Sequence, residues 1–322
     1  MRVIAARNVN QLYRWGLDML AEHGVRRESR AGTVIEMPDP VTSVYYNPTE
    51  RVLFCPNRDA NPFFHLMESV WMLAGRNDVA FPSQFVARMA TFSDNSTTFH
   101  GAYGHRWSNH FLLRRSQLHI VRDLLRRDHD DRRVVLSMWD ANTDLGHDGK
   151  DVPCNTHIYF KVKNGALDMT VCCRSNDIIW GCYGANAVHM SILHEWMALA
   201  TEIPMGIYRQ ISDSYHAYVE LFDKRVLDPW QADLYQQGVT TMPLLQVGED
   251  PLLFLKECEV FIEDPGNTKI DSAWIKYVAR PMYIAWLQYK AKQMDNALQF
   301  AGEVMAKDWR MAATAWLKRR VK

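Results

Sequence analysis

The sequence has no excess of either charge and no long hydrophobic run. Its 322 residues include 37 basic and 37 acidic side chains, so the formal net charge is zero. Proteins that coat nucleic acid or lie on membrane surfaces need an excess of cations, so this balance argues against both classes. No stretch approaches the roughly 20 apolar residues of a membrane span, and the first residues do not form a signal peptide. We therefore expect a cytoplasmic protein without membrane or direct nucleic-acid partners.

Cysteine is also sparse, and the common metal and phosphate motifs are missing. There is no Cys-x-x-Cys pair, no His-x-x-x-His and no glycine-rich phosphate loop. This pattern is typical of reduced thiols and predicts no metal site. The scattered cysteines are Cys55, Cys154, Cys172, Cys173, Cys182 and Cys258. Among such thiols there is room for a single nucleophile.

The residues that are present predict a folded chain that mixes helices and strands. Apolar residues make up 48% and aromatic residues 11%, which excludes a disordered protein. Apolar spacing predicts helices over 61–75, 116–127 and 186–201. Short runs at 134–139 and 208–212 are typical of strands. Residues 270–321 are helical in pattern, and we interpret them as an extension packed on the main body.

A hairpin over residues 157–173 is the clearest local prediction. Two strand-like runs flank Asn164-Gly165, a dipeptide that accepts positive φ in a two-residue turn. Cys154 lies just before the first strand and Arg174 just after the second, so the hairpin brings them together. A free thiol is mostly neutral at pH 7, and a nearby cation favours the reactive thiolate. Cys154 is therefore either a nucleophile or a small buried side chain.

Glu68 is the second candidate. It shares a helix row with Phe64 and Trp71, so its carboxylate projects between large apolar groups. Such a group either pairs with a cation or has a raised pKa suited to proton transfer.

Several arginines and two ring side chains complete the candidate set. Arg30, Arg132 and Arg133 lie in loop-like contexts, where solvation is the ordinary role and convergence on a phosphate is the functional one. His216 and Tyr218 lie on one side of an extended segment, which suits a sugar hydroxyl or a core position equally.

Taken in order, these segments resemble the thymidylate synthase superfamily of pyrimidine C5 one-carbon transferases. The resemblance covers roughly residues 10–225. The matching pieces are Arg30-Ala31-Gly32-Thr33, Glu68-x-x-Trp71-x-x-x-Gly75, Ala102-Tyr103-Gly104-x-x-Trp107, Asp131-Arg132-Arg133-Val134-Val135, Pro153-Cys154, Arg174-Ser175-x-Asp177-x-x-x-Gly181, Asn186 and His216-x-Tyr218.

The resemblance implies a role for each residue. Cys154 would add to C6 of the pyrimidine, and C5 would then take a carbon from the co-substrate 5,10-methylenetetrahydrofolate. The implied catalytic residues are Cys154, Glu68, Tyr103 and Asn155. The implied substrate-binding residues are Arg30, Arg132, Arg133, Arg174, Ser175, Asn186, His216 and Tyr218. The implied folate contacts are Asp177 and Trp107. Arg132 and Arg133 resemble the pair that reaches the partner's phosphate in a homodimer.

Departures from the family pattern favour hydroxymethylation over methylation. Asn155 stands where thymidylate synthases usually have His. The absence of His after the cysteine resembles the phage deoxycytidylate hydroxymethylases. The loop 92–103 is short and lacks a Trp, and the chain ends in Lys318-Arg319-Arg320-Val321-Lys322 instead of an apolar peptide. A wetter site lets water capture the one-carbon unit, whereas a dry one favours reduction to thymidylate. We therefore expect a 5-hydroxymethyl product, and a phage source is typical of such enzymes.

The choice of base depends on Asn186. Thymidylate synthases carry Asn at this position and deoxycytidylate hydroxymethylases carry Asp, so dUMP is the expected substrate. An amide rotated by 180° offers the pattern that cytosine needs. The segment 181–186 is also one residue longer than is usual in the family, so Ala185 is an alternative occupant of this position. Thymidylate synthase, dCMP or CMP hydroxymethylase, and an inactive nucleotide-binding scaffold remain as alternatives.

The expected fold is α/β, with a thymidylate synthase-like mixed sheet flanked by helices and a C-terminal helical extension. We place the catalytic domain in residues 1–240 and the extension in residues 241–322. The homodimer follows from the resemblance alone.

Overall fold

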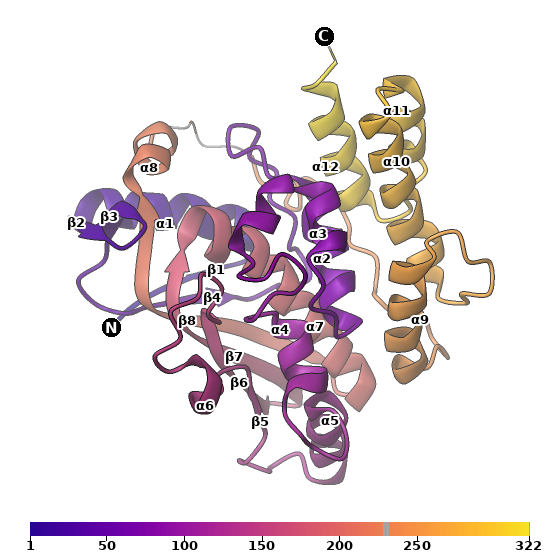
Figure 1. The fold of residues 1–322 in the computed structure, drawn as a ribbon, viewed down its shortest axis with the longest axis horizontal. Helices are drawn as coiled ribbons and strands as arrows, with labels where there is room; N and C mark the ends of the chain where they lie inside the picture. The colour runs from indigo at the N-terminus through magenta and orange to yellow at the C-terminus, as the bar shows by residue number, and fades with distance from the viewer. Residues whose placement is uncertain (228, 230–231, 322) are drawn as a thin grey trace.

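The computed structural model describes residues 1–227, 229 and 232–321, and within them eight strands form one mixed sheet (Figure 1). The strands are β1 (Arg2–Ala6), β2 (Val25–Ser29), β3 (Gly32–Glu36), β4 (Val41–Tyr45), β5 (Val135–Ser137), β6 (Asn155–Lys163), β7 (Ala166–Asp177) and β8 (Met205–Tyr218). The main order is β1-β4-β8-β7-β6-β5, and β3 joins β8 while pairing with β2. The β1/β4 and β7/β8 pairs are parallel, and the other pairs are antiparallel.

Helices pack against this sheet and share its hydrophobic core. They are α1 (Val9–His23), α2 (Pro62–Leu73), α3 (Ala80–Phe85), α4 (Tyr103–His105), α5 (Gln117–Arg127), α6 (Ala141–Asp144), α7 (Asn186–Thr201), α8 (Val219–Arg225), α9 (Pro251–Glu263), α10 (Arg280–Lys290), α11 (Met294–Gly302) and α12 (Lys307–Lys318). Short 3₁₀ or π turns are η1 (Ala87–Phe92), η2 (Arg106–His110), η3 (Ile178–Ala185) and η4 (Ile275–Ala279). This architecture confirms the expected α/β class.

The sheet has one covered face and one open face. Ile158, Val171 and Gln210 are register neighbours that are fully buried. The alternate positions are more open, and Tyr159 is 43% exposed. Because side chains alternate between the two faces of a strand, the helices cover one face and leave much of the other accessible.

Strong local sequence patterns predicted the correct helices, strands and turn. The Asn61 side chain accepts hydrogen bonds from two N–H groups at the start of α2. Asn164 and Gly165 have φ of 51° and 75°, so the predicted two-residue turn is confirmed. The predicted helix over 186–201 matches α7. The predicted strand over 134–139 is shorter as β5, and the strand over 208–212 is longer as β8.

The two longest helices outside the predicted ranges are α1 and α9. Each begins with a cap that the sequence contains. Asn8 accepts from the Asn10 N–H, and Asp250 accepts from the Leu252 N–H.

The C-terminal helices pack against α2. Helices α9, α10 and α12 all contact it. The Phe63 ring lies 5.7 Å from the Trp286 ring and 5.6 Å from the Trp316 ring. A C-terminal helical extension is therefore confirmed, while a domain boundary near residue 240 stays a prediction. Within the described ranges, no helix is long and apolar enough to cross a membrane.

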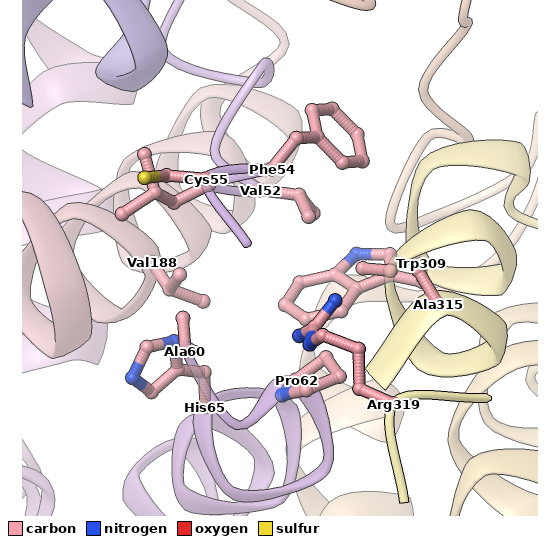
Figure 2. A pocket seen from close by; sticks show the side chains of 12 residues that line it. Val52, Phe54, Cys55, Ala60, Pro62, His65, Val188, Trp309, Ala315 and Arg319 are labelled. Carbon is pink, nitrogen blue, oxygen red and sulfur yellow. The ribbon is translucent and has the colours of Figure 1, made fainter. Parts of the chain in front are cut away.

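A small cavity lies where the C-terminal helix α12 meets the body (Figure 2). Its lining includes Cys55, His65, Val188, Trp309 and Arg319. Its volume is about 30 Å³, enough for one or two water molecules. None of the predicted site residues lines this cavity.

Candidate active site

The mouth of the β6/β7 hairpin brings Cys154 and Arg174 together. The Arg174 N–H donates to the Cys154 carbonyl at 2.9 Å, and the Arg174 Nη2 atom lies 3.9 Å from the Cys154 Sγ atom. The guanidinium also donates to the carbonyls of Pro153 and Val152, at 2.9 Å each. The cation therefore both fixes the loop before the thiol and faces the thiol itself.

Burial and charge act in opposite directions on the thiol. Cys154 is half-buried, and burial raises its pKa above the ordinary value. The positive charges of Arg174 and Arg30 lower that pKa in part, while the nearby Asp151 raises it. The net shift is upward, so the thiol is largely neutral at pH 7 in the free protein.

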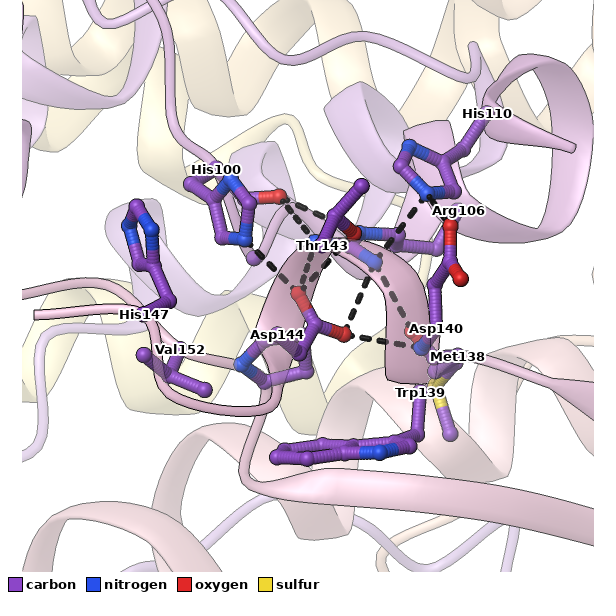
Figure 3. A network of polar contacts seen from close by, with 12 residues as sticks. His100, Arg106, His110, Met138, Trp139, Asp140, Thr143, Asp144, His147 and Val152 are labelled. Carbon is purple, nitrogen blue, oxygen red and sulfur yellow. Dashed lines mark hydrogen bonds and ion pairs between the residues drawn. The ribbon is translucent and has the colours of Figure 1, made fainter. Parts of the chain in front are cut away.

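A buried ion pair anchors the segment that leads to Cys154 (Figure 3). Arg106 and Asp144 have fully buried side chains, with Nη2 to Oδ1 at 2.7 Å and Nη1 to Oδ2 at 3.0 Å. His100 Nε2 lies 2.7 Å from the same Asp144 Oδ1 atom. Because Arg106 and His100 flank Tyr103 in the chain, this network holds the tyrosine and the cysteine segments together.

Tyr103 lies directly beside the nucleophile position. Its hydroxyl accepts a hydrogen bond from the Asn155 N–H at 3.3 Å. Burial raises the pKa of Tyr103 well above its ordinary value, and Cys154 and Cys173 add to that effect. The phenol is therefore a protonated donor at neutral pH.

Asn155 and Asn186 meet next to Cys154. The Asn155 Nδ2 atom donates to the Asn186 Oδ1 atom at 3.1 Å. Asn186 begins α7, directly after the π turn η3, in which Gly184 departs from helical geometry. Asn186, rather than Ala185, has the contact with the nucleophile segment.

Glu68 finds a partner that the sequence analysis did not predict. Its side chain is 12% exposed, and its Oε2 atom lies 3.0 Å from the Nε2 atom of His189 on α7. The two atoms are close enough for an ion pair but are not aligned as a hydrogen bond. His189 lies one helical turn after Asn186, so the first turn of α7 joins Glu68 to the Cys154 region. No local pattern in the sequence signals this pairing.

The ends of β7 and β8 place three further candidates together. Asp177 and His216 are register partners, and the rings of His216 and Tyr218 lie 5.9 Å apart. Asp177 Oδ1 accepts from the N–H groups of Ile179 and Trp180. Its Oδ2 atom is buried and has no well-aligned hydrogen bond within the described residues, while the backbone N–H of Tyr218 lies close to the carboxyl. Burial raises the pKa of this carboxyl.

Tyr218 connects this group to the thiol. Burial raises its pKa, the charges of Asp177 and Cys154 raise it further, and Arg88 and Arg30 oppose the shift. Arg30 itself is exposed in the turn between β2 and β3. The thiol and Arg30 therefore both lie near enough to affect Tyr218.

The remaining candidates lie apart from this group. Arg132 and Arg133 are exposed before β5, and Arg133 pairs with Asp131 at 2.9 Å. No contact in the described ranges joins either arginine to Cys154. Ser175 follows Arg174 in β7 and is half-buried. Trp107 is 1% exposed, with its indole N–H unpaired within the described residues, so the structure does not open its ring to a bound molecule.

Comparison with known proteins identifies the family. The thymidylate synthase family model matches residues 11–249. The chain is 46% identical to the deoxyuridylate hydroxymethyltransferase of Pseudomonas phage M6, over 99% of this chain and 95% of that protein. It is 36% identical to that of Bacillus phage SP01, over 66% and 56% of the two chains, and 31% identical to that of Delftia phage PhiW-14, over 56% and 52%. The match to the phage M6 protein includes the C-terminal helices, and the chain belongs to the thymidylate synthase family.

Proposed function

We propose that this chain transfers a one-carbon unit to C5 of dUMP and releases 5-hydroxymethyl-dUMP. The names of three phage relatives state a deoxyuridylate hydroxymethyltransferase activity, which supports this choice of substrate and product. The carbon comes from 5,10-methylenetetrahydrofolate and the oxygen from water, and tetrahydrofolate leaves without oxidation. The reaction therefore balances without a redox partner. The observation that carries the proposal is the contact between Arg174 and Cys154 at the hairpin mouth.

Cys154 is the proposed nucleophile. Its sulfur forms a bond to C6 of the pyrimidine, and the C5–C6 π electrons move onto C5 and the O4 carbonyl. Since burial keeps the free thiol largely neutral, its proton must leave before or during this step. The positive charges of Arg174 and Arg30 favour the thiolate that results.

Glu68 and Tyr103 are the proposed proton-transfer residues. Addition at C6 must be followed by loss of the C5 proton, and each event needs a positioned acid or base. The Tyr103 hydroxyl is near the thiol, and Glu68 contacts His189 one turn away from Asn186. We propose that Tyr103 assists removal of the C5 proton as a neutral hydrogen-bonding hydroxyl and not as the base, and that Glu68 handles water and protons.

Arg30, Arg174 and Ser175 are the proposed phosphate ligands. A guanidinium has five N–H donors, and Arg174 uses two of its nitrogens on the carbonyls of Val152 and Pro153, so donors remain for an anion. His216 and Tyr218 would bind the ribose 3′-hydroxyl, as their position at the end of β8 allows.

Asn186 is the proposed base-reading residue. One lone pair of its Oδ1 atom and one N–H of its Nδ2 atom remain after its contacts with Asn155 and Asn176. An acceptor and a donor side by side match N3–H and O4 of uracil.

The folate co-substrate supplies the carbon unit when it is bound. Asp177 fits a role in holding it, because its carboxyl lies at the end of β7, has no well-aligned bond at Oδ2 within the described residues, and can accept from N–H groups of a pterin. Trp107 fits less well in this state, since its side chain is buried. Its assignment to the folate site remains a proposal that requires the ring to become accessible.

A homodimer is part of the proposal. The open sheet face, which includes the exposed Tyr159 and Val135, suits a second copy of the chain. Arg132 and Arg133 have no contact with Cys154 of their own chain in the described ranges, which agrees with a role toward the partner's phosphate. Because three of its relatives come from phages, we place the reaction in the cytoplasm of an infected bacterium.

The test is a product analysis with purified protein, dUMP and methylenetetrahydrofolate. We expect 5-hydroxymethyl-dUMP by mass spectrometry, tritium release from [5-³H]dUMP, and no rise in absorbance near 340 nm. Stoichiometric dihydrofolate would instead make the protein a thymidylate synthase. A Cys154→Ser variant should release no tritium. Tritium release by that variant would remove the sulfur from the mechanism.

A further inference from the structure

Three buried asparagines form a single hydrogen-bonded chain through the proposed base-reading residue. Asn155 Nδ2 donates to Asn186 Oδ1 at 3.1 Å, and Asn186 Nδ2 donates to Asn176 Oδ1 at 3.2 Å. Asn176 Nδ2 then donates to Ser212 Oγ at 2.9 Å. All four residues are at most 7% exposed, and they come from β6, α7, β7 and β8. The bonds all run in one direction, so the chain has a polarity.

A rotation of Asn186 alone breaks this polarity at both ends of its amide. The flipped Nδ2 atom would face the Asn155 Nδ2 donor, and the flipped Oδ1 atom would face the Asn176 Oδ1 acceptor. Two buried hydrogen bonds would be replaced by two repulsive contacts. Only a concerted reversal of all three amides, together with the Ser212 hydroxyl, restores the bonds.

The reversed direction of the hydrogen-bonded chain is less stable than the observed direction. In the observed direction, the end of the chain leaves the Asn155 Oδ1 atom buried without a partner in the described part of the molecule. In the reversed direction, the Asn155 amide would instead leave its N–H₂ group unpaired. Unpaired buried N–H groups are rarer in proteins than under-used carbonyl oxygens.

The surroundings leave little room for adjustment. A Cβ atom at Gly181 would lie 2.9 Å from Asn176 Oδ1 and 3.4 Å from Asn186 Nδ2. The backbone of η3 therefore packs against the Asn186–Asn176 bond, and neither amide can move away without displacing it.

We propose that Asn155 and Asn176 are positioning residues that fix the Asn186 amide in the direction that reads uracil. This inference rests on the proposed function, and it assigns the choice between uracil and cytosine to the three-amide chain rather than to Asn186 alone. Cytosine presents an acceptor at N3 and a donor at the 4-amino group, so it needs the reversed polarity.

Two matched substitutions test the proposal, because each changes one amide of the chain to a carboxylate. In Asn176→Asp, a carboxylate oxygen still accepts from Asn186 Nδ2, so the Asn186 amide keeps its direction. In Asn155→Asp, the carboxylate can only accept, so a concerted reversal of Asn186, Asn176 and the Ser212 hydroxyl is needed to turn the Asn186 Nδ2 atom toward it. The direction that reads cytosine is then favoured.

The measurement is the ratio of kcat/KM for dUMP to that for dCMP, with binding of both nucleotides by calorimetry and thermal unfolding of each variant. We expect Asn176→Asp to keep the ratio within about threefold, since the direction of Asn186 is unchanged. We expect Asn155→Asp to shift the ratio toward dCMP by about tenfold or more, which is about 1.4 kcal/mol. Equal effects of the two substitutions, or none, would overturn the inference.

A third variant tests the proposal if Asn155→Asp does not fold or has no turnover. Asn176→Ala removes the acceptor that holds Asn186 Nδ2, so the dUMP preference in binding should fall. An unchanged binding preference in folded Asn176→Ala would overturn the inference as well. Failure of the proposed function is distinguishable, because it would appear in the unmodified protein as no 5-hydroxymethyl product from dUMP.

Discussion

Replacement of Arg174 by Ala should make the Cys154 thiol less reactive. The Arg174 Nη2 atom lies 3.9 Å from Sγ, and the Arg174 side chain is exposed, so we take full screening by water as the lower bound for this pair. Under that condition the attraction between cation and thiolate is about 1 kcal/mol. That energy corresponds to about 0.8 of a pKa unit. The thiol pKa, already raised by burial, should rise further, and the thiolate population should fall about sixfold.

The assay is alkylation by iodoacetamide, followed across pH by mass spectrometry of the peptide that contains Cys154. The rate should fall about sixfold at pH values below the thiol pKa and converge with the unmodified protein above it. Arg174→Lys keeps the positive charge, so its alkylation rate should fall less than that of Arg174→Ala. Labelling of the half-buried Cys172 in the same molecules is the internal control. An unchanged alkylation midpoint in Arg174→Ala would refute the electrostatic role of the guanidinium.

Three stability predictions follow from buried groups. Gly104→Ala would press a Cβ atom against the backbone of α2 and should cost about 1–3 kcal/mol, visible as a lower thermal midpoint. Asp144→Asn leaves the buried Arg106 charge uncompensated and should cost about 3–5 kcal/mol in urea unfolding, whereas Arg133→Ala at the surface should leave the midpoint unchanged. Burial raises the pKa of Asp308 to about 6, so its carboxyl destabilises the folded chain as pH rises from about 4 to 6. Across that range, the free energy of unfolding of Asp308→Asn should rise by up to about 3 kcal/mol relative to that of the unmodified protein. Parallel profiles of unfolding free energy against pH for the two proteins would contradict this.

The sequence could predict contacts that a single local element creates. The turn at Asn164-Gly165 has a residue-level signal in its positive φ, and pairing of the two strands then brings Cys154 and Arg174 together. The contact between Glu68 and His189 has no such signal. It depends on how α2 packs against α7, and those helices are more than 100 residues apart in the sequence.

The same distinction applies to the amide chain. The sequence predicts Asn186 as a site residue and assigns no role to Asn176, which lies between Ser175 and Asp177 of the same motif. Its contribution depends on which face of β7 lies beneath the first turn of α7, and on Ser212 in the adjacent strand. Side-chain register between strands and a helix is set by packing and not by local pattern.

The rings of Trp286 and Trp316 pack against Phe63, and this contact has a consequence for synthesis of the chain on the ribosome. Trp316 is translated 253 residues after Phe63. At about 5–20 residues per second, the apolar side of α2 waits about 10–50 s for its last partner. During that interval the nascent chain presents an unprotected aromatic surface, so binding of a holdase chaperone to the ribosome-bound intermediate is expected to raise the yield of native protein.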